Sequence, residues 1–312
     1  MKIALICNTP SAFPLLNWLH SQGVLVGIGT KEQNRDAYNS DFFSDLSVVC
    51  QQRNLKIQTF TKQDLSQQLS EWQALTKAEL ILVLGFPYKI PKSVLQKPTY
   101  GFFNIHYGKL PRYGGSFPVF WQIKNQEKEG VLTIHQMDKS FDSGPIAVEI
   151  PFEINPKNTF GIVETNYGHI AINGVFQLLN SILQKSLVLK TQKSHNVIFS
   201  PKPTLKDTII DWQKMDAKTI VALIKACNPW NRGAIARIKD VDVKIIEAQI
   251  SMQEGMKAGQ VFHLFQNGME VACINNTALI VKVLYSSFGY LEGETLGAFG
   301  IKSGDVFEKI LV

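Results

Sequence analysis

Residues 80–85 read LILVLG, five aliphatic side chains in a row followed by a glycine. A run of this length without alternation predicts a strand that is buried on both faces of a sheet. Three earlier apolar runs have the same character: 2–7 (KIALIC), 25–30 (LVGIGT) and 56–60 (KIQTF). Helical stretches separate the runs: 11–21, 36–53 and 64–75. Because strands that alternate with helices form parallel sheets with right-handed crossovers, the first part of the chain is predicted to be an α/β domain with a parallel sheet.

Beyond this sheet the chain continues with further predicted strands at 101–105, 132–137 and 145–151 and a long helix at 159–184. A loop rich in Gly and Pro is predicted at 107–118. Residues 192–207 (QKSHNVIFSPKPTLKD) are polar, contain proline and have no periodicity, which is typical of a linker. We therefore expect the first domain to cover residues 1–191.

A different pattern follows the linker. After one helix at 216–226, short strands alternate with Gly, Asp or Asn: 233–239, 243–250, 259–265, 269–274 and 278–285. Regular short strands of this kind predict a small antiparallel β-barrel, here over residues 208–312. Two domains also fit the length of 312 residues, which is long for a single hydrophobic core.

The composition argues against several classes of protein. Hydrophobic residues make up 45% and charged residues 19%, and no apolar run approaches the ~20 residues of a membrane span. The apolar start ends at Asn8, too early for a signal peptide, so we expect a cytoplasmic protein without membrane contact. The cysteines are Cys7, Cys50, Cys227 and Cys273. They form no CxxC pair and none has a histidine at metal-ligand spacing, so reduced thiols and no metal site are expected.

The charge is weakly positive and unevenly distributed. The formal net charge is +6. Up to residue 200 there are 19 Lys and Arg against 14 Asp and Glu, and from residue 201 onward 13 against 12. A dedicated nucleic-acid binder usually has a denser basic patch. The charge therefore permits an anionic substrate without requiring one.

Three side chains suited to carbonyl chemistry lie at a predicted strand end or in a turn between two predicted strands. Asn104 and His106 stand two residues apart, so both point to one face of their strand, and Asp142 lies in the turn 139–144. Asn104 and His106 can donate to the oxygen charge that develops when an amine attacks a carbonyl carbon. Asp142 can accept the amine proton, directly or through water, or orient His106. No Ser or Cys has a nucleophile context, which favours direct transfer. A structural interpretation stays open, with His106 capping a loop and Asp142 making an Asx-turn.

The surroundings of these residues resemble a known family. Residues 103–115 (FNIHYGKLPRYGG) are similar to the motif of the 10-formyltetrahydrofolate-dependent formyltransferases, in which Asn-x-His precedes a Leu-Pro loop. Residues 133–144 (TIHQMDKSFDSG) resemble the family's second motif, which ends in Asp-x-Gly. Landmarks of the methionyl-tRNA formyltransferase-like members follow at 210–212 (IDW) and 228–230 (NPW). The resemblance therefore covers nearly the whole chain.

The resemblance implies a fold, a donor and a set of site residues. The fold would be a Rossmann-like formyltransferase domain followed by a barrel that resembles an OB-fold. The donor would be 10-formyltetrahydrofolate, and Asn104, His106 and Asp142 would be the catalytic residues. The implied walls of the folate pocket are Leu84, Phe86, Tyr88, Leu110, Pro111 and Asp138. The pterin would bind mostly backbone groups there.

The acceptor stays open at this point. A primary amine is expected, with the α-amine of initiator methionyl-tRNA as the leading candidate. The alternative is a nucleotide-linked amino sugar or another small amine. Residues 32–41 (EQNRDAYNSD) are short and not basic where the tRNA enzymes carry a basic loop, which argues against tRNA. A catalytically idle binding module on the same fold is a third interpretation, against which the intact residue trio argues.

Other conspicuous residues have structural interpretations. His135 lies in a predicted strand and is interpreted as a core or edge histidine. Gly27 and Gly29 lack the third glycine and the acidic residue of a dinucleotide fingerprint, so NAD binding is not expected. Trp230 is interpreted as a packing anchor rather than a stacking platform.

Overall fold

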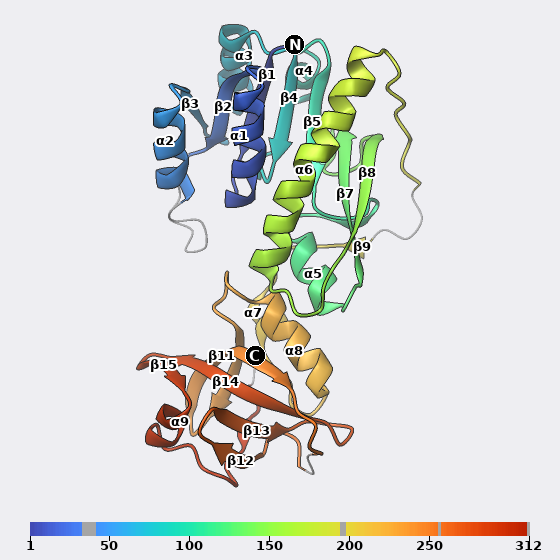
Figure 1. Ribbon diagram of the computed structural model, residues 1–312. Coiled ribbons are helices and arrows are strands. Elements are labelled where there is room, and N and C mark those ends of the chain that lie inside the picture. The colour runs from blue at the N-terminus through green and yellow to red at the C-terminus, as the bar shows by residue number, and fades with distance from the viewer. Residues whose placement is uncertain (33–41, 194–197, 255–256, 311–312) are drawn as a thin grey trace. The chain divides into compact units, whose positions relative to one another are not determined.

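The computed structural model describes residues 1–32, 42–193, 198–254 and 257–310 (Figure 1). The chain forms two compact units. Unit 1 consists of Met1–Pro118, Glu129–Glu153 and Glu164–Pro201, and unit 2 of Val119–Lys128, Ile154–Val163 and Lys202–Val312. Unit 2 thus includes two short segments from within the first predicted domain. The domain boundaries at 191 and 208 stay predictions.

Unit 1 is built on a seven-stranded sheet with the order β3-β2-β1-β4-β5-β7-β8 in the described residues. The strands are β1 (Ile3–Cys7), β2 (Leu25–Lys31), β3 (Ile57–Phe60), β4 (Leu80–Leu84), β5 (Gly101–His106), β7 (Glu129–Gln136) and β8 (Ile146–Glu153). The first five strands are parallel. Strand β7 runs antiparallel to β5, and β8 antiparallel to β7. The predicted parallel α/β sheet is confirmed, and an antiparallel pair extends it.

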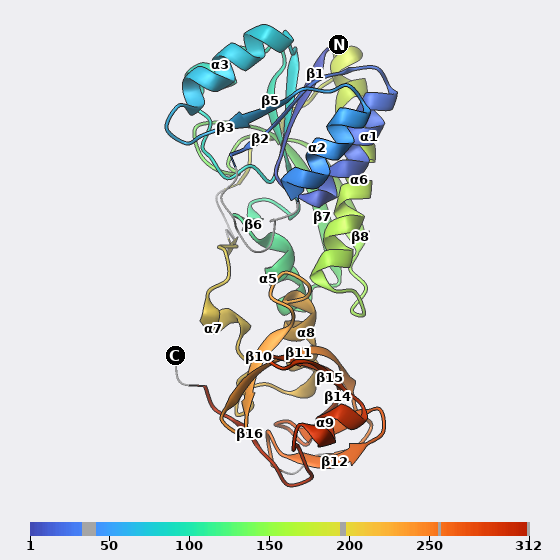
Figure 2. The same cartoon turned by 90° about the vertical axis from the view of Figure 1, so that its left-hand side faces the viewer.

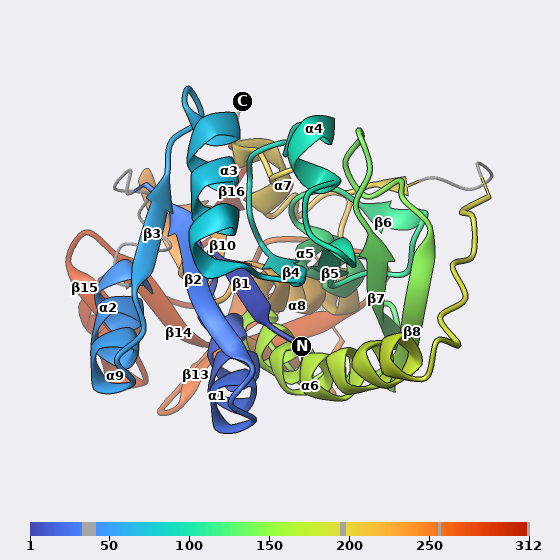
Figure 3. The same cartoon turned by 90° about the horizontal axis from the view of Figure 1, so that it is seen from above.

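Helices cover both faces of this sheet. The helices of unit 1 are α1 (Phe13–Ser21), preceded by the short 3-10 helix η1 (Pro10–Ala12), α2 (Phe42–Gln52), α3 (Leu65–Thr76), α4 (Lys92–Leu95) and most of α6 (Phe160–Leu183). Seen along the sheet, α1 and α6 lie on one face and α3 and α4 on the other (Figure 3). Strands β1 and β4 are therefore buried along their whole length. This double covering explains why their sequences are continuous aliphatic runs rather than alternating ones.

The strand order places a ligand edge next to β5. The chain proceeds outward from β1 to β3 and then returns through β4 to β5 on the other side. In sheets of this kind ligands bind beyond the carboxyl ends of the strands near the point of reversal. Asn104 pairs with Val83 of β4 and His106 is the last residue of β5, so both lie at this edge.

Unit 2 is a curled antiparallel sheet with the order β12-β13-β14-β11-β10-β16, with β15 added to β14 (Figure 2). Its strands are β10 (Ala234–Ile238), β11 (Val241–Ile250), β12 (Val261–Phe265), β13 (Gly268–Ala272), β14 (Ala278–Ser286), β15 (Gly289–Glu292) and β16 (Phe307–Glu308). Backbone bonds connect its two edges, since Phe307 N donates to Gly259 O and Val261 N to Asp305 O, both at 2.8 Å. The predicted small antiparallel barrel is confirmed.

Four helices complete unit 2 in the described residues: α5 (Pro118–Lys124), α7 (Leu205–Thr208), α8 (Ala217–Ala226) and α9 (Glu294–Ala298). Helix α8 packs against β11. Its N-cap is Asp216, whose carboxylate accepts from Thr219 N at 2.8 Å and so satisfies one of the free N–H groups of the first turn.

Two stretches predicted as irregular contain regular structure. The loop at 107–118 includes β6 (Arg112–Gly114), and the linker at 192–207 includes β9 (Ile198–Phe199) and α7. Strands β6 and β9 pair in parallel, and Ser200 N donates to Gly114 O at 2.6 Å. Two short strands far apart in the sequence leave no periodicity to detect, which is why the sequence did not predict them.

Among the described residues, no helix combines the length and apolarity that a membrane span requires.

Candidate active site

Three of the predicted residues meet at one oxygen atom in unit 1. Asn104 Nδ2 donates to Asp142 Oδ1 at 3.2 Å. His106 Nδ1 lies 3.7 Å from the same oxygen. His106 is 5% exposed, so the cluster is largely shielded from water. The expectation that Asn104 and His106 share a face is confirmed.

The backbone around Asp142 is shaped to hold its carboxylate in place. Asp142 adopts a positive φ of 51°, which turns its side chain back toward β5. Its second oxygen, Oδ2, accepts from Gly115 N at 2.8 Å. Gln192 Nε2 donates to Asp142 O at 2.8 Å and to Gly144 O at 2.7 Å, which ties the turn to the end of the first predicted domain.

The electrostatics of the cluster keep Asp142 ionised. Burial by itself would raise the pKa of the carboxyl group. In their protonated forms the adjacent His106 and His135, together with the N–H of Gly115, outweigh burial and hold the pKa well below its usual range. Asp142 Oδ1 lies 3.7 Å from His106 Nδ1, which places the carboxylate where it can act on His106.

The hydrogen bonds of His106 determine which ring nitrogen faces the cluster. His106 Nε2 lies 2.7 Å from Tyr113 O. A carbonyl oxygen only accepts, so Nε2 carries a proton and is occupied. Nδ1 is then the nitrogen that faces Asp142 and is available for chemistry. The loop that contains β6 therefore sets the tautomer of His106.

His135 also lies next to this cluster, and its burial agrees with the interpretation as a core or edge histidine. It is 1% exposed, as a core residue would be. Yet its Nε2 lies 3.1 Å from Asn104 Nδ2 and 3.6 Å from Asp142 Oδ1. The only sequence signal was its position within the second motif, since alternation along the strand gives a direction but no partner.

The predicted donor-pocket residues fall into two groups. Leu110 and Pro111 lie around Gly114, because a Cβ built on Gly114 would be 3.6 Å from Leu110 Cδ2, 3.8 Å from Pro111 O and 3.8 Å from Asp142 Cβ. They therefore border the cluster. Asp138 shapes the turn that carries Asp142, since its Oδ1 accepts from Ser140 N at 2.9 Å and Ser143 Oγ at 2.7 Å.

The second group lies at and just after the end of β4. Phe86 and Tyr88 pack against the core cluster that includes side chains of α3 and α4, and Leu84 is buried outside that cluster. Leu84 is 2% exposed. Phe86 and Tyr88 are half-buried, and their rings make an edge contact with centroids 5.2 Å apart. Tyr88 also lines a hollow of about 380 Å³ with Glu32, Thr61, Lys62 and Gln63.

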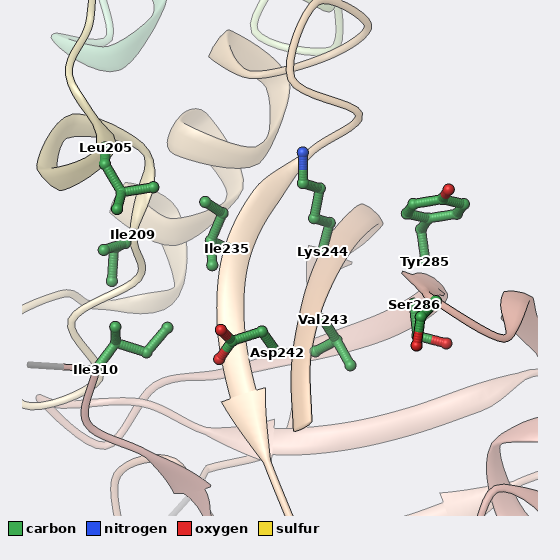
Figure 4. Close-up of a pocket in the computed structure, with 10 residues that line it drawn as sticks. Leu205, Ile209, Ile235, Asp242, Val243, Lys244, Tyr285, Ser286 and Ile310 are labelled. Carbon is green, nitrogen blue, oxygen red and sulfur yellow. The ribbon is translucent and has the colours of Figure 1, made fainter. Parts of the chain in front are cut away.

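Unit 2 has a hollow of its own, of about 220 Å³ (Figure 4). Leu205, Ile209 and Ile310 line one side of it, and Lys244 and Tyr285 stand on the other. The residues that line this hollow do not form a cluster of acid, amide and imidazole groups like the one in unit 1. We therefore assign no chemistry to this hollow.

Metal and thiol chemistry find no support among the described residues. No group of three or more His, Cys, Asp or Glu side chains there is arranged to hold a metal ion. All four cysteines are buried. Burial raises the pKa of the Cys50 thiol to about 11 and those of Cys227 and Cys273 to about 12. Protonated thiols of this kind are poor nucleophiles.

The close approach of two backbones at Gly115 gives a first prediction. Gly115 has a φ of +115°, and a Cβ there would lie 2.7 Å from Ser200 O. We expect Gly115→Ala to push β9 away, weaken the bond to Asp142, and lower stability by about 1–3 kcal/mol. Gly289→Ala is the matched control, since Gly289 has a φ of +111° with nothing within 4 Å of the added Cβ. Thermal unfolding of both variants tests this, and equal losses would contradict it.

The fold, with polar side chains at the carboxyl end of β5, and the cluster of acid, amide and imidazole groups define a class of site that is suited to carbonyl chemistry. Comparison with known proteins narrows this class. Residues 2–178 match the formyl transferase family, and residues 203–287 match the formyl transferase C-terminal domain. The chain belongs to the formyl transferase family. The predicted class of enzyme, a folate-dependent N-formyltransferase with formyl-tetrahydrofolate as donor, is thereby confirmed.

Two curated relatives match over nearly their full length. The methionyl-tRNA formyltransferase of Citrifermentans bemidjiense is 24% identical over 312 residues, 99% of this chain and 97% of that protein. The methionyl-tRNA formyltransferase of Nitrosospira multiformis is 26% identical over 295 residues, 93% of this chain and 92% of that protein.

Solved structures with the same fold include two sugar-related enzymes. WlaRD, a sugar 3N-formyl transferase crystallised with dTDP and 5-N-formyl-THF, superposes with a TM-score of 0.66 at 20% identity, over 90% of this chain and 97% of that one. An N-formyltransferase from Helicobacter canadensis, in complex with folinic acid and dTDP-3-aminofucose, has a TM-score of 0.66 at 18% identity, over 90% and 98%.

Proposed function

We propose that this enzyme transfers the formyl group of 10-formyltetrahydrofolate to a primary amine, with Asn104, His106 and Asp142 as the catalytic residues. The observation that carries the assignment is the convergence of Asn104 Nδ2 and His106 Nδ1 on Asp142 Oδ1. In the reaction the amine nitrogen bonds to the formyl carbon, the bond from that carbon to N10 of the folate breaks, and one proton passes from the amine to N10.

His106 is the group that holds the proton in transit. Its Nε2 is committed to Tyr113 O, so the amine proton is taken at Nδ1. The imidazolium that results faces the ionised Asp142 at 3.7 Å, and this charge pair stabilises it. Asp142 thus acts on the proton through His106 and stays ionised throughout.

Asn104 supplies a donor to the oxygen that gains charge. Its two acceptors, Asp142 Oδ1 and His135 Nε2, lie only 3.6 Å apart and 3.2 and 3.1 Å from Nδ2. The angle at Nδ2 between the directions to these two acceptors is therefore well below the angle between the two N–H bonds of an amide. One N–H can serve both acceptors, which leaves the other for the developing oxyanion.

The donor is proposed to bind between the segment 84–90 and the turn 138–142. The half-buried rings of Phe86 and Tyr88 support this placement. A non-reactive folate analogue should raise the melting temperature by binding linkage, and Tyr88→Ala should reduce that shift. Tyr100→Ala is the control, because Tyr100 precedes the amino end of β5. An undiminished shift in Tyr88→Ala would count against the pocket.

For the acceptor, initiator methionyl-tRNA is the first candidate. The full-length match to methionyl-tRNA formyltransferases supports it. The predicted loop at 32–41 that argued against tRNA lies, apart from Glu32, outside the described residues.

A nucleotide-linked amino sugar is the second candidate, and the charges of unit 2 favour it. Several cations there are paired with carboxylates: Arg237 with Asp242 at 2.6 Å, Lys282 with Glu247 at 3.3 Å, and Lys239 with Asp305 at 3.4 Å. Cations that are paired with carboxylates attract a polyanion only weakly, whereas tight tRNA binding depends on many phosphate contacts.

An acceptor screen with 10-formyltetrahydrofolate separates the two candidates. If the acceptor is charged initiator tRNA, log KM should rise steeply with log salt concentration, with a slope of several units. An amino-sugar nucleotide should give a much shallower slope, because it carries few phosphates. Failure to formylate charged initiator tRNA, together with a shallow slope for the amino-sugar nucleotide, would eliminate the tRNA proposal.

A further inference from the structure

His135 stands directly opposite Asn104 in the sheet. In the antiparallel pair of β5 and β7, Asn104 is the register partner of His135. Side chains that face each other across such a pair have Cβ atoms about 5 Å apart. On its other side β7 has a register shift against β8 between Ile134 and His135. Irregularities of this kind redirect a side chain, and they recur beside active sites.

Hydrogen-bond partners determine the tautomer of His135. Its Nδ1 lies 3.2 Å from the Gln136 carbonyl oxygen, which only accepts, so Nδ1 carries a proton. In the neutral ring Nε2 is then an acceptor. It faces Asn104 Nδ2 at 3.1 Å. Asp142 also only accepts, so the edge of the Asn104 amide that faces Asp142 Oδ1 must be its NH2 group. The two assignments agree with each other.

We infer that His135 is a positioning residue, which holds the amide of Asn104 through a neutral imidazole so that its second N–H faces the formyl oxygen. This inference rests on the proposed role of Asn104. Without an acceptor at position 135 the amide keeps one partner, Asp142, and can rotate about its last torsion. A donor displaced from the oxygen loses transition-state stabilisation, whereas substrate binding is unaffected.

A proton on Nε2 would reverse the contact. Nε2–H would then face the NH2 group of Asn104 donor to donor, and it would be drawn to Asp142 Oδ1 at 3.6 Å. The amide would have to turn its oxygen toward His135 and away from its present contact with Asp142. The positioning role therefore requires the neutral ring with the proton on Nδ1.

Two variants of His135 test the inference by kinetics. His135→Met fills a similar space but offers no strong acceptor, and His135→Gln can place Oε1 near the position of Nε2. We expect His135→Met to lower kcat about 10-fold or more with both KM values within about twofold, and His135→Gln to recover most of the loss. His169→Gln is the matched control, because His169 is an exposed residue of α6. Equal kcat values in the two His135 variants, or a loss confined to KM, would overturn the inference.

A measurement on the unaltered protein separates this inference from the proposed function. Long-range 1H–15N spectra of the 15N-histidine-labelled wild-type enzyme distinguish the two neutral tautomers and the charged ring. The signals of His135 are assigned by their loss in either variant. We expect the Nδ1–H form at neutral pH. An Nε2–H or a charged ring would overturn the inference even if formyl transfer is observed. Absence of formyl transfer in the wild type would instead refute the proposed function.

Discussion

His106→Ala is expected to lower kcat for formyl transfer by about 10²-fold or more, the range found when an acid–base group is removed. His106 is 5% exposed and its Nε2 is held by Tyr113 O, so the loss concerns one well-placed nitrogen. Without Nδ1 no group accepts the amine proton. The imidazolium that Asp142 stabilises then cannot form. Steady-state kinetics with the acceptor identified by the screen provide the measurement.

The controls for His106→Ala separate chemistry from folding and donor binding. The variant should still show the thermal shift caused by a folate analogue, because the proposed donor pocket does not include the ring. His169→Ala, an exposed change on α6, should leave kcat unchanged. Turnover of His106→Ala near the wild-type rate would refute the catalytic role.

Asp142→Asn is expected to have an effect of similar size, about 10²-fold or more in kcat. The amide keeps the shape of the carboxylate and an oxygen for Gly115 N, but it removes the charge that faces His106. Because the two residues act on the same proton, the double variant His106→Ala/Asp142→Asn should be little worse than either single variant. Losses that multiply in the double variant would show that the residues act independently.

The depressed pKa of Asp142 predicts how the stability of the protein depends on pH. The pKa of its carboxyl group is depressed in the folded state, so its contribution to the free energy of unfolding is fully present above the ordinary carboxyl pKa of about 4 and is lost as pH falls further. The wild-type protein should therefore have a higher melting temperature than Asp142→Asn at pH 7. This difference in melting temperature should shrink as the pH falls from 5 to 3.

The control for this pH dependence is Asp45→Asn in the first turn of α2, where the residue is exposed. It should give a melting temperature that differs little from wild type across the same range. A gap between wild type and Asp142→Asn that stays constant with pH would contradict the depressed pKa.

The sequence by itself determined the parallel sheet, the barrel and three of the clustered residues. The continuous aliphatic runs of β1 and β4 could be read because burial on both faces of a sheet leaves no polar position. Asn104 and His106 could be placed together because side chains two apart on a strand share a face. Asp142 could be placed only by resemblance to a known motif, since no local rule links a turn to a strand 38 residues earlier.

The tertiary structure decided what these residues contact. His135 joins the cluster because β7 runs antiparallel to β5 in the register that sets it opposite Asn104. Strands β6 and β9 meet although the sequence predicted a loop and a linker there. The low pKa of Asp142 and the tautomer of His106 follow from residues that the folded chain brings close to them. Periodicity reports which face of an element is buried, whereas hydrogen-bond partners and charges depend on which elements become neighbours, and only the folded chain determines that.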